Sequence, residues 1–216
     1  MLGTTDRRLE LDSIVERSLS LDYTMDRLEI RHLDQPAEYD RQLALLPPGS
    51  AVIVRHRDAS AAASMASGLL PLARAHDVLV LLSAHTPPKR LHADGLHIPE
   101  ASLKFWTATD FARLSPALIT SSAHSLNAVM RAERRGVDAV LLSPVFPTRS
   151  HEDAASLGLH RFAGIARFAR DAGLPIIALG GITPARVHRT LSAGAAGIAG
   201  IGLFVPTGMD VMLPRP

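Results

Sequence analysis

The stretch LPIIALGGITP, residues 174–184, combines three signals of one architecture. Its apolar run, 175–179, is typical of a strand buried on both faces of a parallel sheet. Two glycines follow at 180 and 181, and Thr183-Pro184 then provides a helix cap with proline at the first helical position. The stretch therefore predicts a strand, a tight turn and a helix, which is the repeating unit of α/β folds.

The same succession of apolar run, polar turn and helical segment recurs along the chain. Seven runs are predicted to be strands, and they cover residues 51–54, 78–82, 95–98, 117–120, 139–142, 175–179 and 197–204. Because the runs are continuously apolar, both faces of their sheet should be covered, which indicates a parallel sheet with helices packed on it. A closed eight-stranded barrel and an open doubly wound sheet both satisfy this pattern.

The sequence favours the barrel. No Gly-x-Gly-x-x-Gly turn follows the first strand, where an open nucleotide-binding sheet usually carries one. We therefore predict a TIM (β/α)8 barrel whose irregular first strand lies within residues 19–33. The whole chain, 1–216, is predicted to be one domain, with residues 1–18 an N-terminal arm or extra helix and residues 206–216 an irregular tail.

The composition excludes several classes of protein. Of the 216 residues, 47% are hydrophobic and 20% are charged, as in packed globular proteins, and the absence of cysteine removes disulfides and thiolate chemistry. The formal net charge of +2 and the 4% of aromatic residues give no reason to expect a nucleic-acid partner. No apolar run reaches eighteen residues and the N-terminus is polar, so no membrane partner is expected and a cytoplasmic location is predicted.

Ligands of parallel barrels bind at the carboxyl ends of the strands, so the residues after each run are the candidate site. These positions are rich in cationic, hydroxyl and imidazole groups, and we assign a site role to Arg55, Arg57, Ser122, His124, Thr148, Arg149 and His151. Arginine suits bidentate contact with phosphate, although surface ion pairs are the alternative role for any one of these arginines. Histidines at neighbouring strand ends (His85, His97, His124 and His151) also permit a metal cluster, but no metal ligand is assigned.

Bare main-chain N–H groups are expected at the ends of the last two strands. Gly180 and Gly181 open a helix, and Gly202 follows the final strand, so a phosphate can approach the backbone at both places. Glycines that serve only to form tight turns are the alternative. The occurrence of two such sites side by side, where barrels commonly hold phosphate, favours the phosphate site.

Three blocks of the C-terminal half carry a resemblance to a known family. They are Ala-Leu-Ile-Thr-Ser-Ser-Ala-His-Ser at 117–125, Ser-Pro-Val-Phe-Pro-Thr at 143–148 and Ala-Leu-Gly-Gly-Ile at 178–182. The chain resembles the thiamine phosphate synthase and thiazole tautomerase superfamily over roughly residues 50–204, and that superfamily has the TIM-barrel fold. The resemblance implies a transferase of thiamine biosynthesis that joins hydroxymethylpyrimidine diphosphate to thiazole phosphate and releases pyrophosphate. Small phosphorylated substrates are then its expected partners, and the sequence leaves open whether it forms an oligomer.

The chain departs from the family at its metal-binding positions. The resemblance implies magnesium held by two aspartates, but 83–85 reads Ser-Ala-His and 99–102 reads Pro-Glu-Ala-Ser, so magnesium is poorly supported. Two alternatives therefore stay open. One is a thiazole tautomerase-like proton transfer, with His124 or His151 as acid and base, although the characteristic histidine of that branch falls at Pro144. The other is a catalytically silent barrel that binds a phosphorylated ligand or a partner protein.

Overall fold

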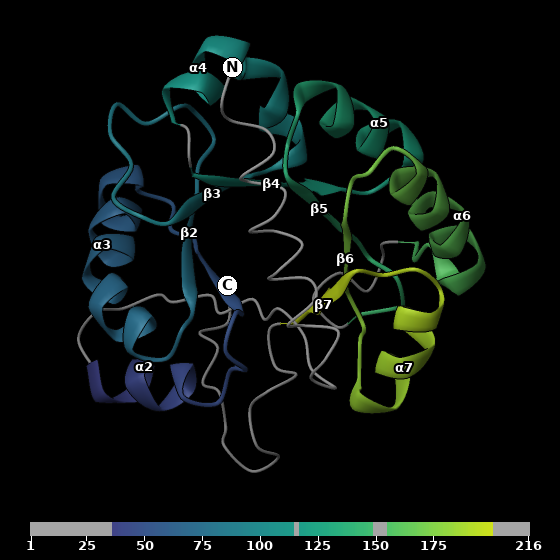
Figure 1. The fold of residues 1–216 in the computed structure, drawn as a ribbon, viewed down its shortest axis with the longest axis horizontal. Coiled ribbons are helices and arrows are strands. Elements are labelled where there is room, and N and C mark those ends of the chain that lie inside the picture. Colours follow the sequence, from purple (N-terminus) through teal and green to yellow (C-terminus); the bar gives the residue numbers. More distant parts are fainter. Residues whose placement is uncertain (1–35, 115–116, 149–154, 201–216) are drawn as a thin grey trace.

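The computed structural model describes residues 36–114, 117–148 and 155–200, and Figure 1 shows a curled parallel sheet with helices along its outer side. All seven predicted strands are present in the order β1 to β7. Their bounds are β1 Ala51–Val54, β2 Leu79–Ser83, β3 Gly95–Ile98, β4 Leu118–Ala123, β5 Ala139–Leu142, β6 Ile176–Leu179 and β7 Gly197–Ala199. The helices are α2 Pro36–Leu43, α3 Ala59–Ala75, the 3-10 helix η1 Glu100–Phe105, α4 Ala108–Arg113, α5 Leu126–Arg135, α6 Gly158–Asp171 and α7 Pro184–Ser192.

The predicted α/β class with a parallel, TIM-like sheet is confirmed, whereas a complete barrel is not shown. Every neighbouring pair of strands from β1 to β7 is parallel. The candidate for the eighth strand, 19–33, lies outside the described residues, as do the predicted arm at 1–18 and the tail at 206–216. Strand β7 ends at Ala199, and residues 201–204 of its predicted range also lie outside the described part.

Strand β4 is longer than its apolar run predicts, because neighbouring carbonyl groups accept hydrogen bonds from its hydroxyl groups. Ser121 Oγ donates to the Ile98 carbonyl oxygen at 2.9 Å, and Thr120 Oγ1 donates to the Leu96 carbonyl oxygen at 3.2 Å. A buried hydroxyl with a partner avoids the desolvation cost of an unpaired one. The strand therefore continues to Ala123 and brings Ser122 to its carboxyl end.

The two faces of the sheet are buried in different ways, which explains the continuously apolar strands. Alternate residues such as Val140 and Leu142 belong to the large core between the sheet and the helices. The intervening residues form a smaller cluster inside the curl of the sheet, made up of Ala51, Ile53, Leu81, Leu141, Ile177 and Ala199. Because side chains alternate along a strand, one apolar run supplies both layers. The inner cluster is the floor beneath the carboxyl ends of the strands.

Carboxylates gather at the opposite, amino-terminal edge of the sheet. Asp94 Oδ2 accepts the Val80 N–H at 2.9 Å, and Asp138 Oδ2 accepts the Ile119 N–H at 2.7 Å. These acids bond to the backbone of the adjacent strand and hold the sheet together at this edge, whereas the predicted ligand site lies at the other edge.

No helix in the described part of the chain is long and apolar enough to span a membrane.

Candidate active site

A cavity of about 1190 Å³ opens at the carboxyl ends of the strands. Its walls come from the ends of β1 to β6, from η1 and from α5, so it lies where a parallel α/β fold is expected to bind its ligand. Leu141 and Leu179 form its apolar floor above the inner core. Among the described residues, its charged lining consists of Arg55, Lys104, Arg131, Arg134 and Arg135 on the cationic side and of Glu100 on the acidic side. This excess of cations over carboxylates suits an anionic ligand.

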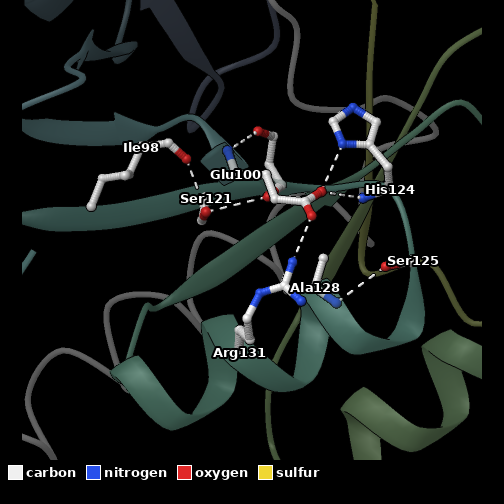
Figure 2. Close-up of polar contacts among 8 residues, drawn as sticks. Ile98, Glu100, Ser121, His124, Ser125, Ala128 and Arg131 are labelled. Carbon is white, nitrogen blue, oxygen red and sulfur yellow. Dashed lines mark hydrogen bonds and ion pairs between the residues drawn. The ribbon is translucent and has the colours of Figure 1, made fainter. Parts of the chain in front are cut away.

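The carboxylate of Glu100 is held by two positively charged or imidazole side chains (Figure 2). Its Oε1 accepts a hydrogen bond from Arg131 Nη2 at 2.7 Å. Its Oε2 accepts the His124 backbone N–H at 2.9 Å and lies 2.8 Å from His124 Nδ1. Since a carboxylate only accepts, the His124 proton on this side sits on Nδ1. The other ring nitrogen, Nε2, points away from Glu100 in Figure 2 and is the one left for proton exchange with a ligand.

Ser122 joins the end of β4 to η1. Its Oγ accepts the Glu100 backbone N–H at 2.9 Å and lines the cavity, so its hydroxyl proton is left to donate to a ligand. This bond holds the turn that carries Glu100 against β4. The His124 side chain, two residues further on, is 57% exposed, whereas that of Glu100 is only 25% exposed. The carboxylate is therefore the inner, fixed partner and the imidazole the accessible one.

His97 is a buried imidazole in the same wall. Only 6% of the residue is exposed, and its Nδ1 lies 3.0 Å from Thr120 Oγ1. Because the Thr120 hydroxyl donates to the Leu96 carbonyl, it accepts from His97 Nδ1–H. The hydrogen bond fixes the orientation of the ring that faces the cavity.

The turn after β6 has the backbone form that the glycine pair predicts. Gly180 and Gly181 have φ of +94° and +65°, which L side chains rarely adopt. The N–H groups of Gly181, Ile182 and Thr183 donate no hydrogen bond to any described residue, and they precede the N-terminus of α7. Such unpaired donors at a helix start suit a phosphate.

The same glycines also have a packing role. A Cβ on Gly181 would lie 2.5 Å from the Pro147 carbonyl oxygen, and a Cβ on Gly180 would lie 2.7 Å from Pro144 Cα. Arg186 Nη1 donates to the Gly181 carbonyl at 2.8 Å, which holds the turn from the α7 side. The tight-turn role of these glycines is therefore present in the structure, whereas phosphate binding at this turn stays a prediction.

The structure brings together five of the residues to which the sequence assigned a site role. Arg55, Ser122, His124, Thr148 and Gly180 line the cavity. Arg57 is exposed and is not part of the cavity lining, because the chain bends after β1 toward the Asp58 cap of α3. Gly181 lies one residue beyond the lining. Arg149, His151 and Gly202 are outside the described residues.

The described residues do not fit a magnesium site. The two segments where the family resemblance places aspartates are bonded to each other, His85 Nδ1 lying 2.8 Å from Ser102 Oγ. Both oxygens of Glu100 already have nitrogen donors. Within the described ranges no three His, Asp or Glu side chains gather as metal ligands, and His85, His97 and His124 each bond to a different residue.

Sequence reasoning missed the cations contributed by η1 and α5. Lys104, Arg131, Arg134 and Arg135 do not follow a strand directly, whereas the predicted site residues all lie just after strand ends. The three arginines have the i, i+3, i+4 spacing of one helix face. This spacing could have indicated a cationic helix face, but only the position of η1 beside α5 shows that the face lines the cavity.

Comparisons with known proteins match most of the chain to one family. A family model described as thiamine monophosphate synthase matches residues 32–204. A putative thiamine-phosphate synthase 2 from Aquifex aeolicus is 38% identical over 116 residues, which are 53% of this chain and 59% of the relative. A thiamine-phosphate synthase from Methanoculleus marisnigri is 39% identical over 119 residues, 54% of either chain. The matched part of the chain thus spans little more than half the length of these curated relatives.

A solved structure of a thiamine phosphate pyrophosphorylase from Pyrococcus furiosus superimposes with a TM-score of 0.61 at 24% identity, covering 85% of this chain and 88% of that one. At that identity the superposition shows a shared TIM-like fold.

Proposed function

Because the chain belongs to the thiamine monophosphate synthase family, we propose that it joins hydroxymethylpyrimidine diphosphate to thiazole phosphate. In this reaction the carbon–oxygen bond to the diphosphate breaks, and the bonding electrons leave with pyrophosphate. The thiazole nitrogen then supplies the electron pair of the new carbon–nitrogen bond, which gives thiamine phosphate. Relatives named thiamine-phosphate synthase support this assignment.

The observation that carries the proposal is the charge of the cavity. Five cationic side chains of the described residues line it, and the one carboxylate found among these residues already accepts hydrogen bonds from Arg131 and His124. A leaving pyrophosphate accumulates negative charge in the transition state, and fixed cations at that point lower the barrier. Arg55 has no hydrogen bond or ion pair with any described residue, so its guanidinium is available to the leaving group.

Each substrate has a proposed place. The N–H groups after Gly180 would bind the phosphate of the thiazole, with Thr148 beside them. Arg55 and Ser122 would bind the diphosphate at the ends of β1 and β4. Arg149 and His151, as a cationic and an imidazole group, and Gly202, as bare backbone that a phosphate can approach, keep the site roles that the sequence predicts. Since the described residues do not form a magnesium site, each role is one that the side chain performs by itself.

The test is the formation of thiamine phosphate from the two substrates by the purified chain, with magnesium varied from zero to millimolar. We expect product from the wild type and a loss of about 10- to 100-fold in kcat/KM for Arg55→Gln, the size of one charge-assisted hydrogen bond. Arg161→Gln, on the exposed side of α6, is the matched control and should leave the rate unchanged. No product at any magnesium concentration would contradict the proposal and leave either proton transfer on a thiazole phosphate or a protein that only binds phosphorylated ligands.

A second candidate function is proton transfer on a thiazole carboxylate phosphate, and the His124–Glu100 pair favours it. The carboxylate holds Nδ1, which directs Nε2 as the acid and base. His124→Ala should then abolish interconversion of the thiazole tautomers while thiazole phosphate still binds. Unchanged interconversion in the variant would exclude this function for His124.

A further inference from the structure

The cavity extends beyond the strand ends into a cationic wall between η1 and α5. This wall consists of Lys104 from η1 and of Arg131, Arg134 and Arg135 from α5. The three arginines share one face of the helix, where like charges repel and destabilise the helix unless something neutralises them. The sole described acid in the cavity lining, Glu100, bonds to Arg131 and His124.

Two members of the wall are fixed by hydrogen bonds, and within the described part of the chain the other two have neither a hydrogen bond nor an ion pair. Arg131 donates to Glu100, and Arg135 donates to the Trp106 carbonyl oxygen. These two bonds tie α5 to η1 and to the residue after it, so the wall is held in place before any ligand binds. Arg134 has no hydrogen bond or ion pair among the described residues, and Lys104 has only the Phe105 ring, 4.9 Å from its Nζ.

The position of Arg134 and Arg135 in the last turn of α5 has a simpler explanation, because cations there interact favourably with the helix dipole. That explanation does not cover Lys104, which comes from another element, or Arg131, which lies one turn earlier. All four side chains line one cavity. A common anionic ligand accounts for the whole set.

We propose that Lys104 and Arg134 belong to a second anion subsite, which binds, without a divalent metal, the same phosphate or diphosphate group that Arg55 and Ser122 are proposed to contact. It lies on the η1 and α5 side of the cavity, whereas the turn after Gly180 lies at the end of β6. A ligand or ligand pair with anionic groups at both places would therefore span the cavity. The inference rests on the proposed function only for the identity of the molecule that carries the group.

Isothermal titration of the full chain with inorganic pyrophosphate in EDTA tests the subsite. We expect Lys104→Gln and Arg134→Gln each to weaken binding about 10-fold, and the double variant about 100-fold, because each removes one charge-assisted contact. Arg161→Gln removes an exposed arginine from α6, outside the cavity, and should change binding less than about 2-fold. Thermal unfolding of each variant checks that the fold is kept.

Several outcomes would overturn the subsite. Pyrophosphate would bind the wild type only with magnesium, or the double variant would bind pyrophosphate as well as the wild type does. The third such outcome is that the Arg161→Gln control weakens binding as much as the double variant. The assay is independent of catalysis, so the two proposals can fail separately. Lost affinity in the double variant supports the subsite even if no thiamine phosphate forms. Undiminished affinity removes it even if the chain is a synthase.

Discussion

Replacing Glu100 by glutamine tests whether this carboxylate organises the site. The side chain accepts three hydrogen bonds, from Arg131 Nη2 at 2.7 Å and from the N–H and Nδ1 of His124 at 2.9 and 2.8 Å. A glutamine oxygen can keep both bonds to His124, but its NH2 group then faces the Arg131 guanidinium, donor against donor. One charge-assisted bond is lost and the negative charge disappears.

The expected loss of stability is modest. A hydrogen bond to a charged group contributes about 1.5–3 kcal/mol when buried. The Arg131 side chain is 54% exposed, so the pair is partly screened by water and the loss should fall to about 1–2 kcal/mol. Urea unfolding measures it, with Glu133→Gln as the control, because Glu133 is exposed on α5 and makes no side-chain bond with described residues.

The imidazole provides a second readout of the same change. In the wild type the neutral His124 ring should carry its proton on Nδ1, which ¹⁵N NMR of the side chain detects, and Glu100→Gln should give a mixture of tautomers. Equal stability of the Glu100 and Glu133 variants, together with an unchanged His124 tautomer, would refute the organising role of the carboxylate.

Three further predictions concern the fold. Phe162→Ala should cost about 3–5 kcal/mol in urea unfolding because this α6 side chain is fully buried, whereas Phe168→Ala, at a position 37% exposed, should cost under about 1 kcal/mol; equal losses would contradict the described packing of α6. Gly181→Ala should destabilise more than Gly136→Ala: both glycines have positive φ, but only at Gly181 does a Cβ meet backbone atoms, whereas nothing lies within 4 Å at Gly136. Hydrogen bonds from the Thr107 side chain, and secondly from its backbone N–H, lower the pKa of Asp110 below its ordinary 3.8. The stability that ionised Asp110 contributes is therefore present at neutral pH and is lost as the pH falls through the lowered pKa. An NMR titration that gives Asp110 its ordinary pKa would contradict the cap of α4 formed by Thr107.

The parallel sheet could be predicted from the sequence because strands that are buried on both faces are continuously apolar. The runs at 51–54, 95–98 and 139–142 coincide with β1, β3 and β5. The end of β4 was misjudged because Ser121, which follows the predicted run at 117–120, looks like a loop residue until the Ile98 carbonyl group of β3 is placed beside it. A closed barrel stays a prediction, because the candidate for its eighth strand at 19–33 lies outside the described residues.

The site was predicted in part, and the reason is geometrical. Residues that directly follow strands, such as Arg55 and Ser122, could be placed at the rim from topology alone. Arg131 and Arg134 could not, because their contribution depends on how η1 packs beside α5. Glu100 was not assigned a site role from the sequence, because its bonds to Arg131 and His124 can be seen only once the side chains are placed.

NMR titration of the isotope-labelled chain tests most directly whether one cavity holds two anionic groups at separate places. Thiazole phosphate should shift the backbone amides of Gly181 and Ile182, while pyrophosphate in EDTA should shift the side-chain Nε signal of Arg134, and saturation with one should leave the other still bound. Competition of the two ligands for a single set of signals, or shifts outside the cavity, would contradict the account.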